Sequence, residues 1–229
     1  MENRWGWGIV RVMKIRISLD IKDLTVNRVI RHFILSDLLL LGGWGLISPV
    51  FGLFIINNIQ DADIFSVGVS VGVYLIIKSI VQLPVAVLLD KKQNEKTSFY
   101  VLVSSLMLAG FSAVAYCAVD TVTGLYIVSA LQGFSFGLYT PSWSVMFSKH
   151  LDSGHCSLDW SLDSTTIGIA SGAAAIFGGF IASAFGFTSI FIVASLLSFV
   201  GAFVLLTVPH LIFPNKTQSK TIISEHTHI

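Results

Sequence analysis

Long apolar stretches dominate the chain and are separated by short polar links. A helix that crosses a bilayer needs roughly 20 mostly apolar residues, and six stretches reach about that length. Their predicted ranges are 33–56, 66–89, 98–118, 121–147, 164–184 and 187–208. The first stretch is too long for the core of a signal peptide, so we expect it to be retained as a span. The pattern therefore predicts an all-α membrane protein with six transmembrane helices.

Composition supports this prediction and leaves no room for a separate soluble domain. Of the 229 residues, 54% are hydrophobic and 12% are charged, and the mean hydropathy is +0.80. Soluble domains usually carry about 25% charged residues. We expect a leader at 1–32, a six-helix domain at 33–208 and a flexible tail at 209–229, with the lipid bilayer as the main partner. The net charge of +1 gives no reason to expect a nucleic acid.

Basic residues fall on alternate links, which predicts the orientation of the chain. The link 57–65 and the turns near Asp120 and Gly186 hold no Lys or Arg, whereas 90–97 holds three. The other basic residues outside the spans are Arg4, Arg11, Lys14, Arg16, Lys22, Arg28, Arg31, Lys149, Lys216 and Lys220. All of these lie on one side of a six-span topology. The positive-inside rule therefore places both termini in the cytoplasm, and we expect the plasma membrane.

Two sequence matches indicate an internal repeat. The string GLISP at 45–49 matches GLYTP at 137–141, and Gly68 and Gly72 in the second span match Gly168 and Gly172 in the fifth. We therefore expect 33–118 and 121–208 to be two three-helix repeats. Because three is odd, such repeats insert with opposite topology, as in many transporters.

The repeated glycines and prolines have a packing interpretation and a functional one. Glycines at four-residue spacing let helix backbones approach closely in lipid. Pro49 and Pro141 each remove a backbone hydrogen bond inside a predicted span. Static packing accounts for all of these residues, but matched helix breaks in two repeats are typical of a transport cavity. We favour the cavity.

A lysine deep in the second span is the first candidate for a functional residue. Tyr74, Lys78 and Gln82 recur every four residues and form one polar stripe on a helix. Lys78 lies too far from either end of the span to reach the headgroups. Such a residue either binds an anionic substrate or relays charge. The alternative is a structural lysine that pairs with a neighbouring carboxylate or with carbonyl groups.

Polar and aromatic residues on the first and fourth spans form two further stripes. Asp37 lies in register with Trp44 and Ser48 on the first span. The fourth span holds the matching candidates Gln132, Tyr139 and Trp143, and Ser129 is the counterpart of Asp37. These side chains suit an unknown small organic substrate. Aromatic residues at helical spacing also occur in ordinary packing, and this alternative stays open.

No enzyme or metal site is expected. The chain has no H-E-x-x-H motif, no nucleophile elbow, no phosphate-binding glycine loop and no paired carboxylates within a predicted span. One link gathers His150, Asp152, His155, Cys156 and Asp159, but their spacing matches no metal motif, so we interpret it as a solvated loop. Cys117 and Cys156 fall on opposite membrane sides and cannot pair. We expect no cofactor.

Three segments resemble the major facilitator superfamily. PVAVLLDKKQNEK at 84–96 resembles the family's signature loop, G-x-L-A-D-R-x-G-R-R, and LQGFSFG at 131–137 is similar to its fourth-helix motif. Gly178 and Gly179, followed by FGF at 185–187 and Phe191, look like its fifth and sixth helices. The resemblance covers 30–210. It implies that Asp90 makes gate contacts on the cytoplasmic side, with Lys91 and Lys92 as its basic followers.

The departures from the family pattern are specific. Ala86 stands where the motif begins with glycine, and the internal glycine is absent, so we expect a different turn in the loop. Ser129 stands where the family has an arginine associated with proton coupling, which argues against proton-driven transport by that route.

The family has twelve helices in two six-helix halves, and this chain resembles one half. The resemblance implies a half-size transporter that works by alternating access as a homodimer, or with a second six-helix half supplied by another protein. A truncated transporter fragment and a membrane scaffold or assembly protein are the alternatives.

Overall fold

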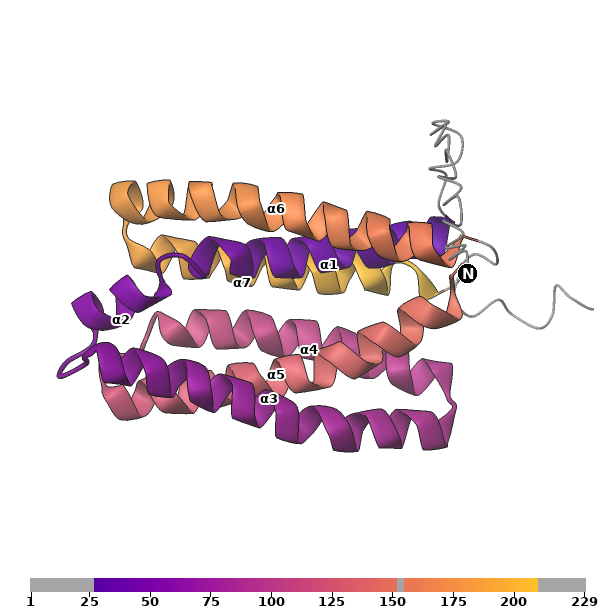
Figure 1. Ribbon diagram of the computed structural model, residues 1–229, viewed down its shortest axis with the longest axis horizontal. Helices are drawn as coiled ribbons and strands as arrows, with labels where there is room; N and C mark the ends of the chain where they lie inside the picture. The colour runs from indigo at the N-terminus through magenta and orange to yellow at the C-terminus, as the bar shows by residue number, and fades with distance from the viewer. Residues whose placement is uncertain (1–26, 152–154, 210–229) are drawn as a thin grey trace, which may run out of the picture.

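The computed structural model describes residues 27–151 and 155–209, and these fold into a bundle of long helices (Figure 1). The helices are α1 (Arg28–Ile47), α2 (Phe51–Asn58), α3 (Ile64–Lys92), α4 (Glu95–Tyr116), α5 (Val122–Lys149), α6 (Cys156–Phe185) and α7 (Phe187–Leu206). Six of these are long and apolar enough to cross a membrane, and α2 is the exception. The protein is therefore an all-helical integral membrane protein. The predicted leader and tail lie mostly outside the described residues, as does Asp152.

The first predicted span, 33–56, is wrong as a single helix. α1 ends at Ile47, a turn covers 48–50, and α2 begins at Phe51. Pro49 explains the break because proline has no backbone N–H and its ring clashes with the preceding helical turn. Pro141 has a different effect, since α5 continues through it to Lys149. The two matched prolines thus produce one break and one continuous helix.

Two helices begin earlier than the apolar pattern predicts. α1 begins at Arg28, where the Asn27 side chain accepts a hydrogen bond from the Val29 amide, so 28–32 is helix and not leader. α6 begins at Cys156, not at 164, and Asp159 is a buried helical residue. The prediction that Asp159 lies in a solvated loop is therefore wrong. Polar turns extend both helices beyond the part that apolar residues mark.

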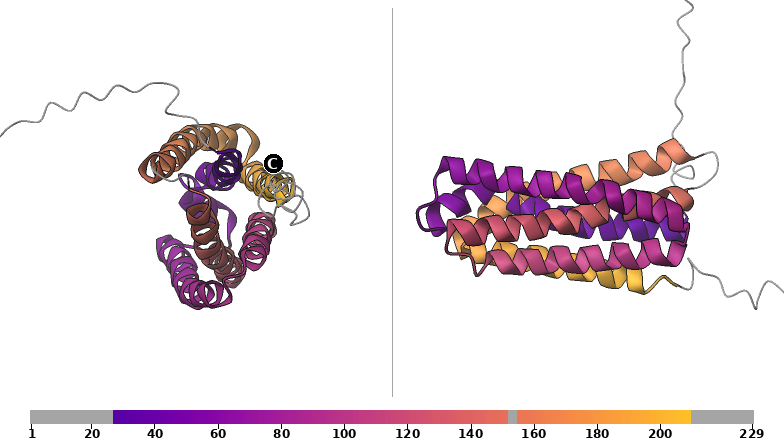
Figure 2. Two further views of the ribbon diagram at one scale, coloured as in Figure 1. Left: turned by 90° about the vertical axis from the view of Figure 1, so that its right-hand side faces the viewer. Right: turned by 90° about the horizontal axis from the view of Figure 1, so that it is seen from below.

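The helix contacts of the first repeat are equivalent to those of the second. α1 packs on α6 and α7, α5 packs on α3 and α4, and α4 packs on α7. Exchanging α1 with α5, α3 with α6 and α4 with α7 leaves this set of contacts unchanged. The left panel of Figure 2 shows α3 and α6 at the two edges of one side of the bundle, with α1 and α5 between them. This arrangement is that of two inverted three-helix repeats.

Glycines let α5 approach α3 and α1 approach α6. A Cβ atom at Gly133 would lie 2.5 Å from the Tyr74 carbonyl oxygen, and one at Gly137 would lie 2.9 Å from the Lys78 carbonyl oxygen. A Cβ at Gly45 would lie 3.0 Å from the Cα of Ser171, and one at Gly178 would collide with the Leu46 carbonyl group. Matched helix pairs therefore approach closely in both repeats.

In the described part of the chain, the glycines at four-residue spacing make no close contact with a neighbouring helix, so the packing interpretation gains no support there. A Cβ at Gly68, Gly72, Gly168 or Gly172 would meet nothing within 4 Å in the described part of the chain. On both helices these glycines point away from the neighbour that the helix packs against, because the contact residues lie on the other side. We name these two surfaces the outer glycine faces of α3 and α6.

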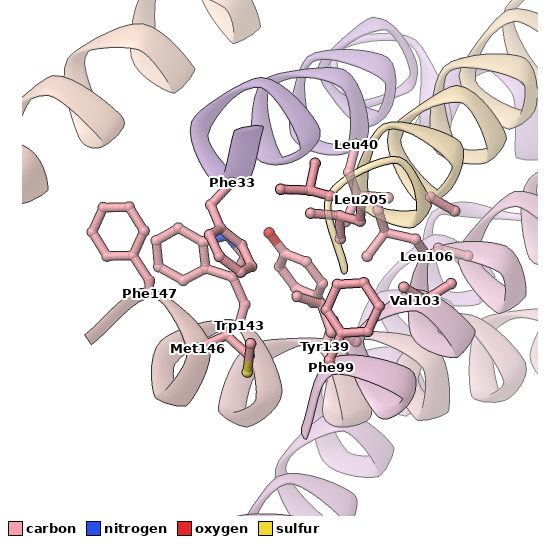
Figure 3. Packing of buried hydrophobic residues seen from close by; sticks show 14 of the residues in the cluster. Phe33, Leu40, Phe99, Val103, Leu106, Tyr139, Trp143, Met146, Phe147 and Leu205 are labelled. Atoms are coloured by element: carbon pink, nitrogen blue, oxygen red, sulfur yellow. The ribbon is translucent and has the colours of Figure 1, made fainter. Parts of the chain in front are cut away.

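Two apolar clusters fill the two halves of the bundle. In the cluster shown in Figure 3, Phe33 and Leu40 of α1 meet Phe99 of α4 and Tyr139 of α5. The second cluster joins α1, α2, α4, α5 and α7, and in it Phe54 and Phe191 lie with ring centroids 4.7 Å apart. These clusters fix the relative positions of α1, α4, α5 and α7.

Charge divides the two ends of the bundle. One end carries Arg28, Arg31, Lys91, Lys92, Lys96 and Lys149, and we name it the basic end. The opposite links, 59–63 and 117–121, hold Asp61, Asp63 and Asp120 but no Lys or Arg, and form the acidic end. Both described ends of the chain, at Asn27 and Pro209, lie at the basic end (Figure 1). Six crossings explain why they share one end.

Candidate functional site

Two adjoining chambers lie between α1, α3 and α5. The acidic-end chamber, of about 330 Å³, is lined by Leu41, Trp44, Ile47, Ser48, Phe51, Ser70, Val71, Tyr74, Ser129, Gln132 and Phe136. The central chamber, also of about 330 Å³, is lined by Asp37, Leu41, Tyr74, Lys78, Phe136, Tyr139, Thr140, Trp143 and Ser144. Leu41, Tyr74 and Phe136 border both chambers, so the two share a wall.

The structure brings together eight of the nine predicted pathway residues. The acidic-end chamber contains Trp44, Ser48, Tyr74 and Gln132. The central chamber contains Asp37, Lys78, Tyr139, Trp143 and again Tyr74. Helical spacing explains this, because residues three or four positions apart share a face of their helix. Gln82, on the last turn of the predicted α3 stripe, lines neither chamber.

Lys78 occupies the midpoint of α3, because Ile64 lies 14 residues before it and Lys92 lies 14 residues after it. At 1.5 Å per residue, either end of the helix is about 21 Å away. Within the described ranges, its ammonium group makes no ion pair or hydrogen bond. Asp37 lines the same chamber but is not its ion-pair partner. The structural-lysine interpretation, which requires such a partner, therefore gains no support.

Asp37 is engaged by a tyrosine from the other repeat. Its side chain is 3% exposed, and its Oδ1 accepts a hydrogen bond from the Tyr139 hydroxyl. The two residues link α1 to α5, and each belongs to a stripe that the sequence predicts. A buried carboxyl group needs such a partner, since an unsatisfied polar group is costly in this environment.

A buried chain of hydroxyl groups borders the acidic-end chamber. Ser70 Oγ lies 2.8 Å from Ser129 Oγ, and Ser129 Oγ lies 3.0 Å from the Tyr116 hydroxyl. Tyr116 donates to Gln132 Oε1 at 2.8 Å. Because a carbonyl oxygen only accepts, Tyr116 accepts from Ser129 and Ser129 accepts from Ser70. The chain of bonds fixes the Gln132 carbonyl and leaves the two N–H groups of its amide as donors.

Aromatic rings from three helices form the apolar wall between the chambers. The Phe136 ring lies 5.5 Å from Trp44 and 5.9 Å from Tyr74, both in edge-to-face geometry. Trp143 stacks on Phe147 at 4.5 Å. The indole Nε1 atoms of Trp44 and Trp143 are buried and have no hydrogen-bond partner in the described structure. Packing thus positions the rings and leaves two indole N–H groups unused.

The predicted gate loop is helical. Asp90, Lys91 and Lys92 form the last turn of α3 and not a loop, and only Gln93 and Asn94 link α3 to α4. Cations near the end of a helix are favoured by its dipole. Gln93 occupies the position of the motif's internal glycine and has φ 44°, the left-handed conformation that suits glycine. Gln93 therefore adopts a backbone conformation that residues other than glycine rarely adopt.

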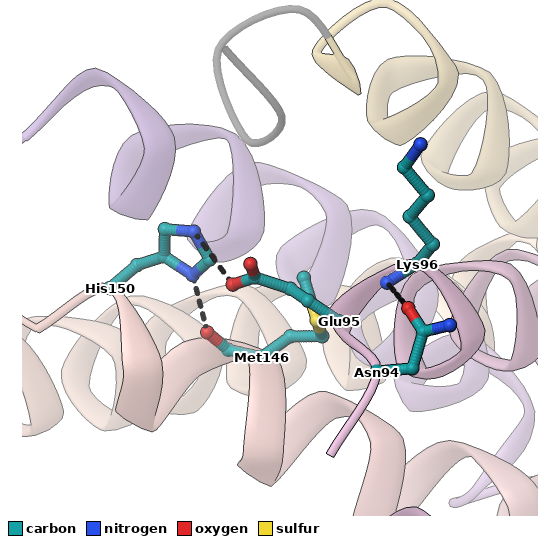
Figure 4. A network of polar contacts seen from close by, with 5 residues as sticks. All are labelled: Asn94, Glu95, Lys96, Met146 and His150. Carbon is teal, nitrogen blue, oxygen red and sulfur yellow. Dashed lines mark hydrogen bonds and ion pairs between the residues drawn. The ribbon is translucent and has the colours of Figure 1, made fainter. Parts of the chain in front are cut away.

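Asp90 keeps a place at the surface of the basic end. It lines a hollow together with Leu89, Gln93, Val145 and Lys149, while Lys91 and Lys92 are exposed. Nearby, His150 Nε2 lies 3.4 Å from Glu95 Oε1, and His150 Nδ1 lies 2.8 Å from the Met146 carbonyl oxygen (Figure 4). This pair ties the start of α4 to the end of α5.

The described residues form no group of three metal-ligating side chains. His155 and Cys156 are exposed at the start of α6, and Cys117 is exposed at the opposite end of the bundle. The two cysteines therefore lie at opposite ends, as the topology predicts.

Ser70 and Tyr116 are site residues that the sequence pattern does not reveal. Both are common residue types in helices, and their importance arises only from contacts between α3, α4 and α5. Ser129 was identified as the counterpart of Asp37, but its hydrogen bonds to Ser70 and Tyr116 carried no signal in the sequence. The signal that could have found Ser70 is its four-residue offset from Tyr74 on the stripe of Lys78.

Comparison with known proteins identifies the fold. Residues 33–226 match the family model of the Major Facilitator Superfamily. The structure is similar to that of the POT family transporter PepTSo, solved by in meso crystallography, with a TM-score of 0.64 at 14% sequence identity. The match covers 80% of this chain and 38% of that chain. No curated protein matches the sequence.

Proposed function

Because the chain belongs to the Major Facilitator Superfamily, we propose that it is a transporter unit that moves a small solute by alternating access across the plasma membrane. The single observation that carries this proposal is the pair of chambers between α1, α3 and α5, which holds polar groups from both repeats at mid-bundle depth. In transporters with inverted repeats the substrate site lies near the bilayer midplane between the repeats. Family membership also favours a transporter over a membrane enzyme.

The proposed pathway residues are the eight that line the chambers, with Asp90, Lys91 and Lys92 at the cytoplasmic gate. Lys78 supplies the mid-membrane charge, and Asp37 and Tyr139 join the repeats across the central chamber. The basic end faces the cytoplasm, because basic residues favour that side. Both termini are then cytoplasmic.

We further propose that a second copy of the chain completes the pathway. The chain spans 38% of the length of the structurally similar transporter, and the outer glycine faces of α3 and α6 contact nothing in the described structure. Two copies with the same orientation are related by a two-fold axis along the membrane normal. Since α3 and α6 are the edges of one side (Figure 2), this axis places α3 of one copy beside α6 of the other.

Cross-linking tests the two-copy arrangement. In a variant whose native cysteines are replaced by serine, Gly72→Cys combined with Gly172→Cys is expected to give a covalent dimer on oxidation in the membrane. Phe111→Cys is the matched control, because Phe111 is exposed on α4, away from the side that holds α3 and α6. A strictly monomeric chain in lipid nanodiscs, with no cross-link, would contradict the proposal and favour the scaffold alternative.

An untargeted assay tests transport whatever the solute is. Cells producing the wild type are compared with cells producing Lys78→Ala or Asp37→Asn, and solutes in the cells and the medium are measured by mass spectrometry. We expect at least one solute to redistribute only with the wild type, while all three proteins insert in the membrane. If both variants redistribute the same solutes as the wild type, these residues are not part of the mechanism.

Thiol labelling tests the orientation. A maleimide that does not cross membranes should label Cys117 in intact cells and reach Cys156 only after the cells are opened, because the two thiols lie at opposite ends. Burial raises the pKa of the Cys117 thiol, so labelling is best carried out at mildly alkaline pH. If Cys156 alone is labelled in intact cells, the orientation is the opposite of the proposed one.

A further inference from the structure

The central chamber contains a positive charge with no counterion from the described residues. Lys78 makes no ion pair there, and Asp37, the acidic residue of the chamber wall, bonds to Tyr139 instead. An uncompensated charge at this depth is costly, so intramembrane lysines normally face a partner or a water-filled pathway. A bound anion would compensate Lys78 without changing the contact between Asp37 and Tyr139.

The surrounding wall offers hydrogen-bond donors that the protein leaves unused. The indole N–H groups of Trp44 and Trp143 are buried without partners in the described structure, and the Gln132 amide nitrogen remains available because its oxygen accepts from Tyr116. The hydroxyl groups of Thr140 and Ser144 donate to backbone carbonyls. The unused donors therefore include N–H groups and an ammonium, which match a ligand rich in acceptor atoms.

Apart from serines in the acidic-end chamber, the rest of the lining is mostly apolar and aromatic. Leu41, Tyr74 and Phe136 border both chambers, and Phe51 and Val71 extend the acidic-end chamber. Each chamber has a volume of about 330 Å³, at the lower end of the usual range for small-molecule sites. Such a wall accommodates one or two fused rings.

From this distribution of charge, unused donors and aromatic surface, we propose that the chambers bind an amphipathic organic anion. The acid group of the ligand contacts Lys78 in the central chamber, and its apolar body lies against Trp44, Tyr74 and Phe136. This inference rests on the proposed function, since it names the substrate class of the same pathway.

The test uses three probes of matched shape and different charge. Binding of 2-naphthoate, 2-naphthamide and 2-(aminomethyl)naphthalene to the full chain in lipid nanodiscs is measured by titration calorimetry, with empty nanodiscs as the reference for partition into lipid. We expect 2-naphthoate to bind at least tenfold more tightly than the amide. The amine should bind nanodiscs that contain the protein no more tightly than it binds empty nanodiscs. Equal affinity for acid and amide, or preference for the amine, would overturn the proposal.

Variants test whether Lys78 and Trp143 cause the preference for the acid over the amide. Lys78→Gln is expected to weaken 2-naphthoate binding at least tenfold and to change amide binding less than twofold, whereas Lys78→Arg keeps the preference for the acid. Trp143→Phe should weaken the binding of 2-naphthoate about threefold. Arg31→Gln, on the basic end of α1, and Trp160→Phe, whose ring packs on Trp143, are the controls and should leave binding unchanged. Full 2-naphthoate binding by Lys78→Gln would contradict the inference.

Transport assays separate this inference from the proposed function. If 2-naphthoate binds through Lys78 but proteoliposomes move no solute, the transport proposal fails and the anion site stands. If a neutral or cationic solute is moved in a Lys78-dependent manner and 2-naphthoate does not bind, the anion site fails and the transport proposal stands.

Discussion

α3 and α6 occupy equivalent places in the two repeats, but their inner faces are chemically different. Aligning Gly68 with Gly168 pairs Asp63, Ser70, Tyr74 and Lys78 with Asp163, Ala170, Ala174 and Gly178. On α6 the small residues allow close contact with α1, where the Gly42 position would meet Ala170 and the Gly45 position would meet Ala174. On α3 the equivalent residues Ser70, Tyr74 and Lys78 are polar and border the chambers, which no α6 residue lines.

The difference between the inner faces of α3 and α6 distinguishes residues that pack helices from residues that border the chambers. Both helices pack on their partners through glycine contacts, so the repeat supplies the same framework twice. At the midpoint of the helix only α3 carries a charged residue, Lys78, whereas α6 carries small residues there. Fold symmetry thus does not require functional symmetry, and α3, unlike α6, contributes polar residues to the proposed pathway.

The largest expected effect comes from breaking the close contact of α6. Gly178→Leu forces a side chain into the backbone of α1 at Leu46, and we expect a loss of about 3 kcal/mol in the free energy of unfolding. Thermal unfolding in detergent measures it. Gly179→Leu is the control, because a Cβ there would meet nothing within 4 Å. Equal losses in the two variants would show that the contact with α1 is not the cause.

A smaller effect is expected when Ser70 of α3 is replaced by alanine, the residue at the equivalent position 170 of α6. Ser70→Ala removes the hydrogen bond to Ser129 and should cost about 1 kcal/mol of unfolding free energy, because Ser129 stays buried. Ser79→Ala removes only a bond to the carbonyl of Leu75 on the exposed side of the same helix. We expect that control to change the melting temperature far less. A larger shift for Ser79→Ala would argue against the hydroxyl chain.

The ends of the two helices offer a stabilising test. The C-cap residue of α3 is Gln93, with φ 44° and ψ 20°, whereas that of α6 is Gly186, with φ 81° and ψ 167°. Gln93→Gly places glycine at both C-caps, and we expect a gain of up to about 1 kcal/mol in stability, because glycine adopts the left-handed conformation of residue 93 without strain. Gln82→Gly, the same substitution inside α3, should instead destabilise by about 1 kcal/mol. Denaturation curves of both variants decide whether the conformation of residue 93 matters.

The smallest effect concerns the aspartates that precede the paired glycines. Asp63 caps α3 and accepts hydrogen bonds from the Ser66 amide and hydroxyl, both at 2.8 Å, whereas Asp163 is buried inside α6. These bonds, led by the one from the backbone amide, hold the pKa of Asp63 below its ordinary value. The stabilisation is therefore complete above the unfolded-state pKa of about 3.9 and is lost as the pH falls through the lower folded-state pKa.

Comparing the melting temperatures of Asp63→Ala and the wild type measures this dependence. The difference should be constant near neutral pH and should shrink below about pH 4. Asp63→Asn, which keeps a capping oxygen without the ionisation, should show less dependence on pH. A difference that persists unchanged at low pH would show that the charge of Asp63 is not involved.

Hydropathy predicted four of the six spans well, because burial in lipid selects apolar residues over the whole length of a helix. α3, α4, α5 and α7 begin and end within three residues of the predicted ranges. The starts of α1 and α6 differ from the predicted ranges because a cap and polar turns determine them. Asn27 caps α1, and the first turns of α6 hold Asp159 and Trp160, which hydropathy counts as loop.

Helical periodicity predicted the candidate site better than it predicted the packing. Asp37 and Tyr139 were placed on inward stripes, and the structure joins them by a hydrogen bond. Periodicity does not say which face of a helix meets which neighbour, so the contacts of Ser70 with Ser129 and the outward position of Gly68 and Gly72 could not be foreseen. The same limit applies to Pro49, whose effect depends on the α2 segment that follows it.

The link between α6 and α7 has a consequence for biosynthesis. Gly186 alone joins the end of α6 at Phe185 to the start of α7 at Phe187, and this is the shortest link between helices in the described part of the chain. We expect the two to enter the bilayer together as one helical hairpin after the ribosome has released both. A split version of the protein, made as two co-expressed fragments, should therefore be divided in the longer link at 150–155, because a cut at residue 186 would separate halves of a single insertion unit.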